Sequence, residues 1–216
     1  MKENIFEKSK PRILILCSHN SVRSQLAEAV FRYLGKGKIE VKSAGINPCG
    51  VNPYVYKVLE EVGISSGGLY SKSVTEFINR KFDYVITVCD RADKSCPVFS
   101  GKYRKIHYPL SDPGEAQDQE IDALSAFRNT RNIIKALAIE FLGLELKKAN
   151  LKCPFCGVIQ EIDIPQDRRF AFYKCPHCQK RISPSKESCC VICGFSDKIC
   201  PEFYKQTIEK FLREEA

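Results

Sequence analysis

The chain has 216 residues, twelve of them cysteine, and a formal net charge of +8. This length suits one medium-sized domain and one small domain, because domains commonly contain about 100–200 residues. The start of the chain is charged and has no apolar core of secretory length, and no later run reaches the ~18 apolar residues that a membrane span needs. These features predict a cytoplasmic protein without a membrane partner, in which cysteines serve as metal ligands or redox centres.

The cysteines divide the chain into two parts. Eight of them lie between residues 153 and 200, and the other four are spread over the first 150 residues: Cys17, Cys49, Cys89 and Cys96. We therefore expect an N-terminal tail at 1–11, a first domain at 12–146 and a cysteine-rich domain at 151–216. The cysteine-rich domain has eleven Lys and Arg against nine Asp and Glu, so most of the net positive charge belongs to the first domain.

Strand and helix signals alternate along the first domain. In chain order, the apolar patterns predict a strand at 12–16, a helix at 24–34, a strand at 39–45, a helix at 52–63, strands at 82–89 and 104–110, and a long amphipathic helix at 119–142. This alternation predicts an α/β fold, with a small four-stranded parallel sheet and helices on both faces. In such folds, ligands bind beyond the carboxyl ends of the strands.

The first predicted strand ends at a cysteine, and a short loop connects it to the first helix. This stretch reads Cys17, then residues 18–22, then Arg23 and Ser24. Backbone N–H groups of such a loop, together with the helix dipole, can bind a tetrahedral oxyanion, and Arg23 would add a bidentate contact. The same donors stabilise a thiolate, the nucleophilic form of cysteine. The alternative is a buried structural cysteine beside a surface arginine, which does not explain why strand, Cys-x5-Arg-Ser and helix coincide.

The stretch "CSHNSVRS" resembles the signature loop of the low-molecular-weight tyrosine phosphatase superfamily. Further stretches resemble the thioredoxin-coupled arsenate reductase branch of that superfamily more closely than its phosphatases: "RSQLAEAV", "SAGINP", "GVNP", "SKSVTEF", "VCDRADKSCPVF", "SDPGEA" and "FRNTRNII". The resemblance continues in register from about residue 12 to 142. It implies the same α/β fold that the alternation of strands and helices predicts.

The resemblance also implies roles for individual residues. Cys17 matches the nucleophile, Asp112 the general acid, and Cys89 and Cys96 the second and third redox cysteines. The residues of the oxyanion loop are Ser18, His19, Asn20, Ser21, Val22, Arg23 and Ser24. His19 either contacts the anion or faces solvent, and Asn20 is expected to brace the loop. Cys49 has no expected role.

Some members of the branch bind potassium through positions that match Asn20, Glu28 and Ser43, together with an acidic residue. In this chain Lys72 stands where the acidic residue is expected. Because the lysine ammonium could replace the cation, we do not expect potassium.

By resemblance, the predicted function is reduction of arsenate to arsenite by a three-cysteine relay that thioredoxin recycles. The first alternative is a phosphatase that forms a phosphocysteine at Cys17, with Cys89 and Cys96 as incidental thiols. Phosphotyrosine-acting members usually carry an aromatic residue directly after the Asp-Pro pair, where this chain has Gly114, so reduction is favoured. A second alternative is a zinc-binding regulator that senses an oxyanion or binds nucleic acid.

Two Cys-x2-Cys pairs separated by eighteen residues predict a zinc-ribbon-like site. Its four ligands are Cys153, Cys156, Cys175 and Cys178. Such a pattern is typical of a closed, structural tetrathiolate zinc site, and metal binding would supply much of the folding free energy of so small a domain. No organic cofactor is expected.

The sequence leaves open whether the chain holds one zinc or two; the candidate ligands of a second zinc are Cys189, Cys190, Cys193 and Cys200. Spacing alone leaves other pairings open, for example Cys175 and Cys178 with Cys190 and Cys193. Residues 202–214 are predicted to form a closing helix. The zinc-binding part could dock a partner, bind nucleic acid or cap the fold, although its weak positive charge makes nucleic acid the less favoured partner.

The segment at 89–96 is predicted to form a short surface helix. Its two cysteines are seven residues apart, which places their Cα atoms roughly 10 Å apart along a helix. A disulfide needs about 4.4–6.8 Å between Cα atoms. Formation of a Cys89–Cys96 disulfide therefore requires this helix to unwind.

Overall fold

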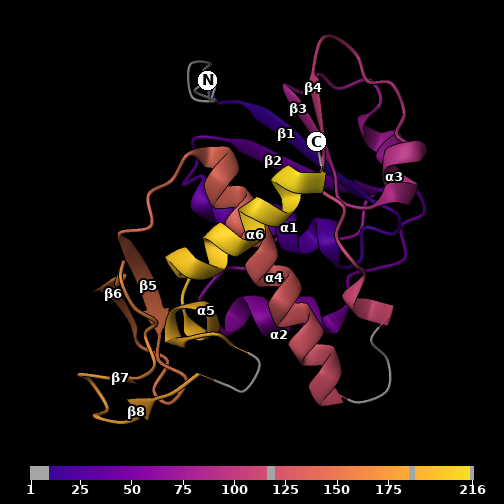
Figure 1. Ribbon diagram of the computed structural model, residues 1–216. Coiled ribbons are helices and arrows are strands. Elements are labelled where there is room, and N and C mark those ends of the chain that lie inside the picture. Colours follow the sequence, from indigo (N-terminus) through magenta and orange to yellow (C-terminus); the bar gives the residue numbers. More distant parts are fainter. Residues whose placement is uncertain (1–9, 116–119, 185–187, 215–216) are drawn as a thin grey trace.

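The computed structural model describes residues 10–115, 120–184 and 188–214. Most of the predicted tail at 1–11, and the predicted first residue of the long helix, residue 119, lie outside the described residues. The first part of the chain forms one parallel sheet of four strands in the order β2-β1-β3-β4 (Figure 1). The strands are β1 (Arg12–Cys17), β2 (Glu40–Gly45), β3 (Tyr84–Thr87) and β4 (Arg104–His107).

The central strand β1 is the most apolar part of the sheet. Its residues Ile13 to Leu16 are fully buried, as expected for a strand that has neighbours on both edges and is covered on both faces. In the pairing with β2, Cys17 lies opposite Gly45, and in the pairing with β3, Leu16 lies opposite Thr87. The carboxyl ends of β1 and β3 therefore lie side by side.

Helices cover both faces of the sheet, as the sequence predicts. On one face, α1 (Arg23–Leu34) and the long α4 (Glu120–Leu142) pack together, and the ring of Phe141 contacts both Phe31 of α1 and Tyr84 of β3. Side chains alternate along a strand, so Thr87, three residues after Tyr84, points to the other face. There it contacts Asp93 of the short helix α3 (Asp90–Lys94).

The remaining helical elements of the first part lie in the connection between β2 and β3 and in the connection between β4 and α4. Helix α2 (Pro53–Glu60) begins with proline at its first position, and the side chain of Asn52 accepts a hydrogen bond from the Tyr54 amide, a typical N-cap arrangement. Two short 3-10 helices, η2 (Val74–Phe77) and η3 (Pro113–Glu115), were not predicted. Each is a single turn, too short to give a periodic apolar signal.

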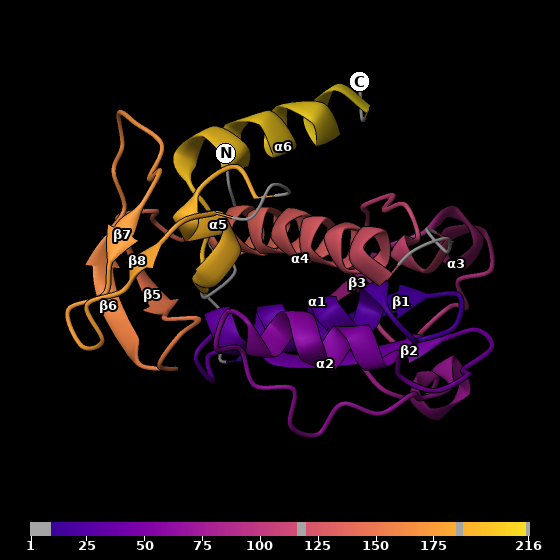
Figure 2. The same cartoon turned by 90° about the horizontal axis from the view of Figure 1, so that it is seen from below.

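The cysteine-rich part consists of two small antiparallel ribbons and two helices. Its elements are β5 (Lys148–Lys152), β6 (Ile159–Asp163), β7 (Tyr173–Lys174), β8 (Arg181–Ile182), α5 (Val191–Phe195) and α6 (Pro201–Glu214). Figure 2 shows α4 between α6 on one side and α1 with α2 on the other, in agreement with the contacts between these helices. The closing helix is confirmed, whereas α5 was not predicted.

Among the described residues, no helix is long and apolar enough to cross a membrane. The predicted ends of the strands and helices coincide with the observed ones or differ from them by at most three residues, mainly because the sequence pattern includes buried residues just outside the hydrogen-bonded strands. The third strand, predicted at 82–89, is confined to Tyr84–Thr87.

Candidate active site and cysteine clusters

Cys17 is the last residue of β1, and its sulfur lies directly below the turn into α1. Its side chain is buried, with the sulfur 2.9 Å from the Ser24 hydroxyl. The backbone N–H of Asn20 donates to the same sulfur at 3.1 Å. Both contacts come from the predicted oxyanion loop, so the loop closes around the sulfur, and such donors stabilise a thiolate.

The carbonyl groups of the loop are held on its outer side by the segment that follows β2. The amides of Asn47, Cys49 and Asn52 donate to the carbonyls of Ser18, His19 and Ser21, respectively. In a planar trans peptide the C=O and the next N–H point in opposite directions. The amides of residues 19, 20 and 22 therefore point inward, which the contact between the Asn20 amide and Cys17 confirms directly.

Asn20 holds the loop to the layers beneath it. It is fully buried with φ of 47°, a left-handed conformation that asparagine tolerates better than most residues. Its side-chain amide donates to Ser24 and Ser43 at 2.8 Å each, and its side-chain oxygen accepts from the Lys72 amide at 2.7 Å. A Cβ on Gly45 would lie 2.7 Å from the Asn20 nitrogen, so this close approach requires glycine.

Lys72 and Glu28 form a buried ion pair behind the loop. The Lys72 ammonium lies 3.2 Å from a Glu28 carboxylate oxygen and donates to the Tyr70 carbonyl at 2.8 Å. The same Glu28 oxygen accepts from the amide and hydroxyl of Ser43. The ammonium of Lys72 is thus the buried positive charge beside Glu28, and the more exposed Arg32 lies 3.7 Å from the other Glu28 oxygen.

Arg23, the first residue of α1, reaches across to the loop after β4. It donates to the Leu110 carbonyl at 2.9 Å and to a carboxylate oxygen of Asp112 at 2.5 Å. The other Asp112 oxygen accepts from the Gly114 amide at 3.0 Å. The structure therefore brings the predicted anion clamp and the predicted general acid into direct contact.

The two predicted redox cysteines flank α3. Cys89 is the buried residue that precedes this helix, and its sulfur lies 3.3 Å from the Ser18 hydroxyl in the oxyanion loop. Cys96 lies beyond the other end of the helix and is half-buried. Burial raises the pKa of the Cys96 thiol and Asp93 adds to the rise, while Lys105 opposes it. Cys89 is thus placed beside the Cys17 loop, and Cys96 is separated from it by the helix.

Comparison with known proteins agrees with this geometry. The model of the low molecular weight phosphotyrosine protein phosphatase family matches residues 12–152. The chain belongs to this family. The matched region contains the oxyanion loop, both cysteines that flank α3, and Asp112.

Proteins with sequences similar to this chain are named arsenate reductases. An arsenate reductase from Halalkalibacterium halodurans is 35% identical over 127 residues, which cover 58% of this chain and 91% of the relative. Arsenate reductase 1 of Staphylococcus epidermidis is 37% identical over 131 residues, covering 61% and 94%. A solved structure of an arsenate reductase in the oxidized state has a TM-score of 0.53 at 29% identity and covers 62% of this chain and 97% of the other.

The family match ends at residue 152, immediately before the clustered cysteines begin. The first cluster joins the two Cys-x2-Cys pairs as predicted: Cys153, Cys156, Cys175 and Cys178. Two sulfur pairs, Cys153–Cys178 and Cys156–Cys175, are each 3.8 Å apart. A tetrahedral zinc site with Zn–S of about 2.3 Å separates its sulfurs by roughly 3.8 Å, so the cluster has the dimensions of a tetrathiolate metal site.

The second cluster consists of Cys189, Cys190, Cys193 and Cys200, so the alternative in which Cys175 and Cys178 pair with Cys190 and Cys193 is wrong. The sulfur of Cys200 lies 3.6 Å from that of Cys189 and 3.7 Å from that of Cys193. The backbone amides of Cys200 and Phe203 donate to cluster sulfurs at 3.4 Å each. Such N–H groups stabilise thiolates, and the spacing again suits a metal ion.

Two fully buried cations of α4 hold the loop of the second cluster. Arg131 donates to the Cys193 carbonyl at 3.3 Å, and Lys135 donates to the carbonyls of Ser196 and Lys198 at 2.9 Å each. Burial lowers the pKa of Lys135 to about 7, and the neighbouring Arg131 contributes. The first cluster is formed by the turns that connect β5 to β6 and β7 to β8, whereas the second is joined to the long helix α4.

The structure thus brings Cys17, Arg23, Asp112 and Cys89 around one loop and places Cys96 one helix away. Of the loop residues, Ser21 is half-buried and Val22 is buried. His19 is exposed, and its carbonyl accepts from Cys49 and Ser71. Sequence reasoning missed the roles of Arg131 and Lys135, although their i, i+4 spacing places both on one face of α4.

Proposed function

We propose that the protein reduces arsenate to arsenite with electrons from its own thiols. The observation that carries this proposal is the position of Cys89, whose sulfur lies 3.3 Å from Ser18 in the loop that closes around Cys17. A phosphatase needs only one thiol at this place. A second thiol beside the oxyanion loop, and a third beyond a short helix, provide what a two-electron reduction requires. The names of the relatives support the same substrate.

In the proposed reaction, the Cys17 thiolate attacks the arsenic of arsenate and a hydroxyl leaves as water. The Cys89 thiolate then attacks the Cys17 sulfur. The sulfur–arsenic bond breaks, its electron pair stays on arsenic, and arsenite departs as a Cys17–Cys89 disulfide forms. Next, the Cys96 thiolate attacks the Cys89 sulfur and Cys17 leaves as a thiolate. The chain is then oxidised at Cys89–Cys96.

Arg23 and Asp112 take the charge and the proton in this scheme. The inward amides of the loop and the Arg23 guanidinium bind the arsenate oxygens. As the anion engages Arg23, the guanidinium turns from Asp112 and leaves that side chain free to act on the departing hydroxyl. Asp112 then carries the proton that goes to the departing hydroxyl.

A dithiol protein of the thioredoxin class is the proposed reductant. Reduction of Cys89–Cys96 needs a thiolate that attacks one sulfur and a second thiol that resolves the mixed disulfide. Thioredoxin supplies both from one small protein. The disulfide must be accessible to it, which unwinding of α3 would achieve.

We propose that both cysteine clusters hold zinc. The sulfur separations support four-coordinate thiolate sites at Cys153, Cys156, Cys175 and Cys178 and at Cys189, Cys190, Cys193 and Cys200. A closed set of four thiolates leaves no open position, so each zinc would be structural. Its contribution is to fold the ribbons and the loop before α6.

The proposed function is tested by coupled turnover of arsenate with thioredoxin, thioredoxin reductase and NADPH, beside hydrolysis of para-nitrophenyl phosphate. Cys17→Ser should abolish both activities, because both need this thiolate. Cys89→Ser should stop multiple-turnover reduction and spare residual phosphate hydrolysis. Cys49→Ser is the matched control and should retain both. Full reductase turnover by Cys89→Ser would overturn the relay, and efficient hydrolysis without arsenate turnover by the unmodified chain would favour the phosphatase.

A further inference from the structure

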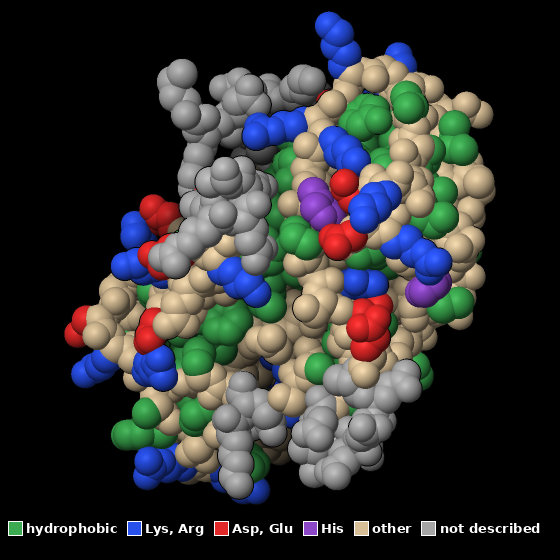
Figure 3. All heavy atoms as spheres, turned by 45° about the vertical axis from the view of Figure 1, so that its right-hand side comes forward, with side chains coloured by type: hydrophobic (Ala, Val, Ile, Leu, Met, Phe, Trp, Pro, Cys, Tyr) green, Lys and Arg blue, Asp and Glu red, His purple; other side chains and the backbone are tan. Residues whose placement is uncertain are grey.

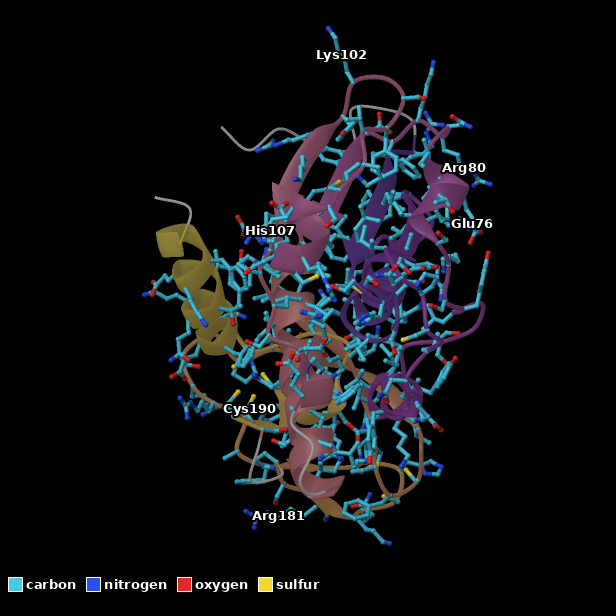
Figure 4. The ribbon with its side chains drawn as sticks, turned by 90° about the vertical axis from the view of Figure 1, so that its right-hand side faces the viewer. Glu76, Arg80, Lys102, His107, Arg181 and Cys190 are labelled. Carbon is cyan, nitrogen blue, oxygen red and sulfur yellow. The ribbon has the colours of Figure 1, made fainter. Side chains whose placement is uncertain are left out.

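A cluster of polar side chains outside the proposed relay connects α3 to the sheet. Thr87 ends β3, and Lys105 and His107 belong to β4, where His107 is the direct neighbour of Thr87 in the strand pairing. All three contact acidic residues of α3, Asp90 and Asp93. Figure 4 labels His107 near the end of its strand, and Figure 3 shows acidic and basic side chains gathered around a histidine on this side of the molecule.

Asp93 is the centre of this cluster. One of its carboxylate oxygens lies 2.7 Å from the Thr87 hydroxyl and 2.9 Å from the Lys105 ammonium. Lys105 also donates to the backbone carbonyl of Asp93 at 3.1 Å, so a cation binds the carboxyl end of α3. Partial burial would raise the pKa of Asp93, but the hydrogen bonds from Thr87 and Lys105, with His107 nearby, hold it below its usual range.

The donor and the acceptor of the hydrogen bonds at Thr87 can be assigned. Because the Thr87 hydroxyl donates to Asp93, the Nδ1 of His107, 2.8 Å from the same hydroxyl oxygen, must donate to it. The other ring nitrogen of His107 lies 3.3 Å from Asp90. One chain of hydrogen bonds therefore runs from β4 through β3 into α3.

These contacts exist only while α3 is folded. The structure is helical from Asp90 to Lys94, with Cys89 directly before the helix and Cys96 two residues beyond it. Seven helical steps would span roughly 10 Å between Cα atoms, whereas a disulfide needs about 4.4–6.8 Å. When the Cys89–Cys96 disulfide forms, the backbone between the two cysteines must rearrange. Asp90 and Asp93 lie within that backbone, so their contacts to the sheet are made in the reduced form and lost or weakened in the oxidised form.

We propose that Thr87, Lys105 and His107 are positioning residues that set the reduction potential of the Cys89–Cys96 pair by holding α3 in its reduced, helical form. This inference rests on the proposed function for its biological meaning. An interaction made only by the reduced form stabilises the dithiol, which raises the potential and makes the disulfide easier for an external dithiol to reduce. The same contacts keep Cys96 away from Cys89 until Cys89 has reacted.

The test measures the reduction potential of the pair in the full-length, metal-loaded protein. In a Cys17→Ser background, the competing Cys17–Cys89 disulfide is absent. The chain is equilibrated in dithiothreitol redox buffers, alkylated, and the Cys89–Cys96 disulfide is quantified by mass spectrometry. Hydrogen exchange of residues 89–100 is followed in both oxidation states.

Thr87→Val keeps the shape of a buried side chain and removes the hydroxyl that joins Asp93 to His107. We expect the disulfide to become about tenfold more stable relative to the dithiol, which lowers the potential by ~30 mV. Lys105→Met should give a smaller change, about threefold or ~15 mV, because Lys105 and Asp93 are partly exposed and solvent screens the pair. His107→Gln should fall between these two values.

The matched controls are Thr75→Val and Lys102→Met. Thr75 lies in η2, and its hydroxyl contacts the hydroxyl of Ser73. Figure 4 shows Lys102 projecting from the loop before β4, at the far end from His107. Neither control should move the potential by more than a few millivolts. The positioning role would be overturned if Thr87→Val and Lys105→Met had the same reduction potential as the Cys17→Ser background. It would also be overturned if the two controls shifted the potential as far as these variants do.

The outcome separates this inference from the proposed function. The expected shifts in potential without any arsenate turnover by the unmodified chain would support the positioning role and count against arsenate reduction. Normal arsenate turnover by the unmodified chain, with no change of reduction potential in the variants, would support arsenate reduction and count against the positioning role. If Thr87→Val fails to fold, the Lys105 and His107 variants still decide, because both side chains are partly exposed at the sheet edge.

Discussion

Arg23 donates to Asp112 across 2.5 Å, so the residue that would bind the oxyanion and the residue that would protonate the leaving group are ion-pair partners. The pair is partly shielded from solvent, since the Arg23 side chain is 10% and the Asp112 side chain 23% exposed. An arriving anion competes with Asp112 for the guanidinium. In the proposed reaction, binding of the anion to Arg23 would therefore also release Asp112 from its ion pair.

Asp112→Asn should slow the chemical step much more than it weakens binding. Loss of a general acid costs about 100- to 10,000-fold in rate, whereas the amide no longer competes as an anion for Arg23, so inorganic phosphate should bind as well as before or more tightly. The rate is measured by single-turnover arsenate reduction and the affinity by calorimetry with phosphate. Asp163→Asn, an exposed change at the end of β6, is the control. A loss of phosphate affinity as large as the loss of rate would show that Asp112 supports the loop rather than donating a proton.

Lys72→Met should destabilise the protein strongly. The buried Glu28 carboxylate would lose the ammonium 3.2 Å away and retain Arg32, a more exposed cation 3.7 Å from its other oxygen. Breaking a buried ion pair costs about 3–5 kcal/mol, and Arg32 should keep the loss toward the lower end of that range. The double variant Lys72→Met, Glu28→Gln should recover most of that loss because the charge is removed with its partner. Urea unfolding measures the free energy of unfolding of the single and the double variant. Equal stability of the single and double variants would contradict the proposed ion pair.

The sequence was most informative where chemistry depends on neighbours along the chain. Cys17 and Arg23 lie in one loop, and the strand before it is a continuous apolar run, so their roles follow from a short stretch. The four strands also follow from local patterns. The observed grouping of the cysteines was the favoured prediction, but an alternative stayed open because Cys-x2-Cys spacing alone fits several pairings.

The missed features depend on tertiary contacts. Thr87 and His107 are twenty residues apart and meet only because β3 and β4 pair in one particular register. Arg131 and Lys135 would be assigned to a solvated helix face from sequence alone. The burial of Lys135 is explained by carbonyl groups of the second cysteine loop, more than sixty residues away, and that of Arg131 by the same loop together with Glu61 and the Val58 carbonyl.

The thiol of Cys96 should react slowly at neutral pH. Burial raises its pKa, so at pH 7 it has less thiolate than an unperturbed cysteine, and the rate of alkylation by iodoacetamide should rise about tenfold per pH unit below that pKa. Peptide-level mass spectrometry gives the rate, with the unfolded chain as reference. In Thr87→Val, which loosens α3, Cys96 should react faster at the same pH. Equal rates for folded and unfolded chains at pH 7 would contradict the raised pKa.

Removal of the two metals should have unequal effects on the first domain. Cys153→Ser with Cys156→Ser should lose one zinc per chain and loosen the ribbons, while α4 and arsenate turnover are retained. Cys190→Ser with Cys193→Ser should lose the other zinc and also increase hydrogen exchange in α4, most of all around Lys135, because both hydrogen bonds of its buried amine go to carbonyls of the second cysteine loop and buried polar groups without partners are costly. Arg131 would lose its contact with Cys193 but keep Glu61. Metal analysis counts the zinc, and exchange mass spectrometry compares α4 in the two double variants. Unchanged exchange in α4 after loss of the second zinc would show that the cysteine-rich part folds independently of the helix it contacts.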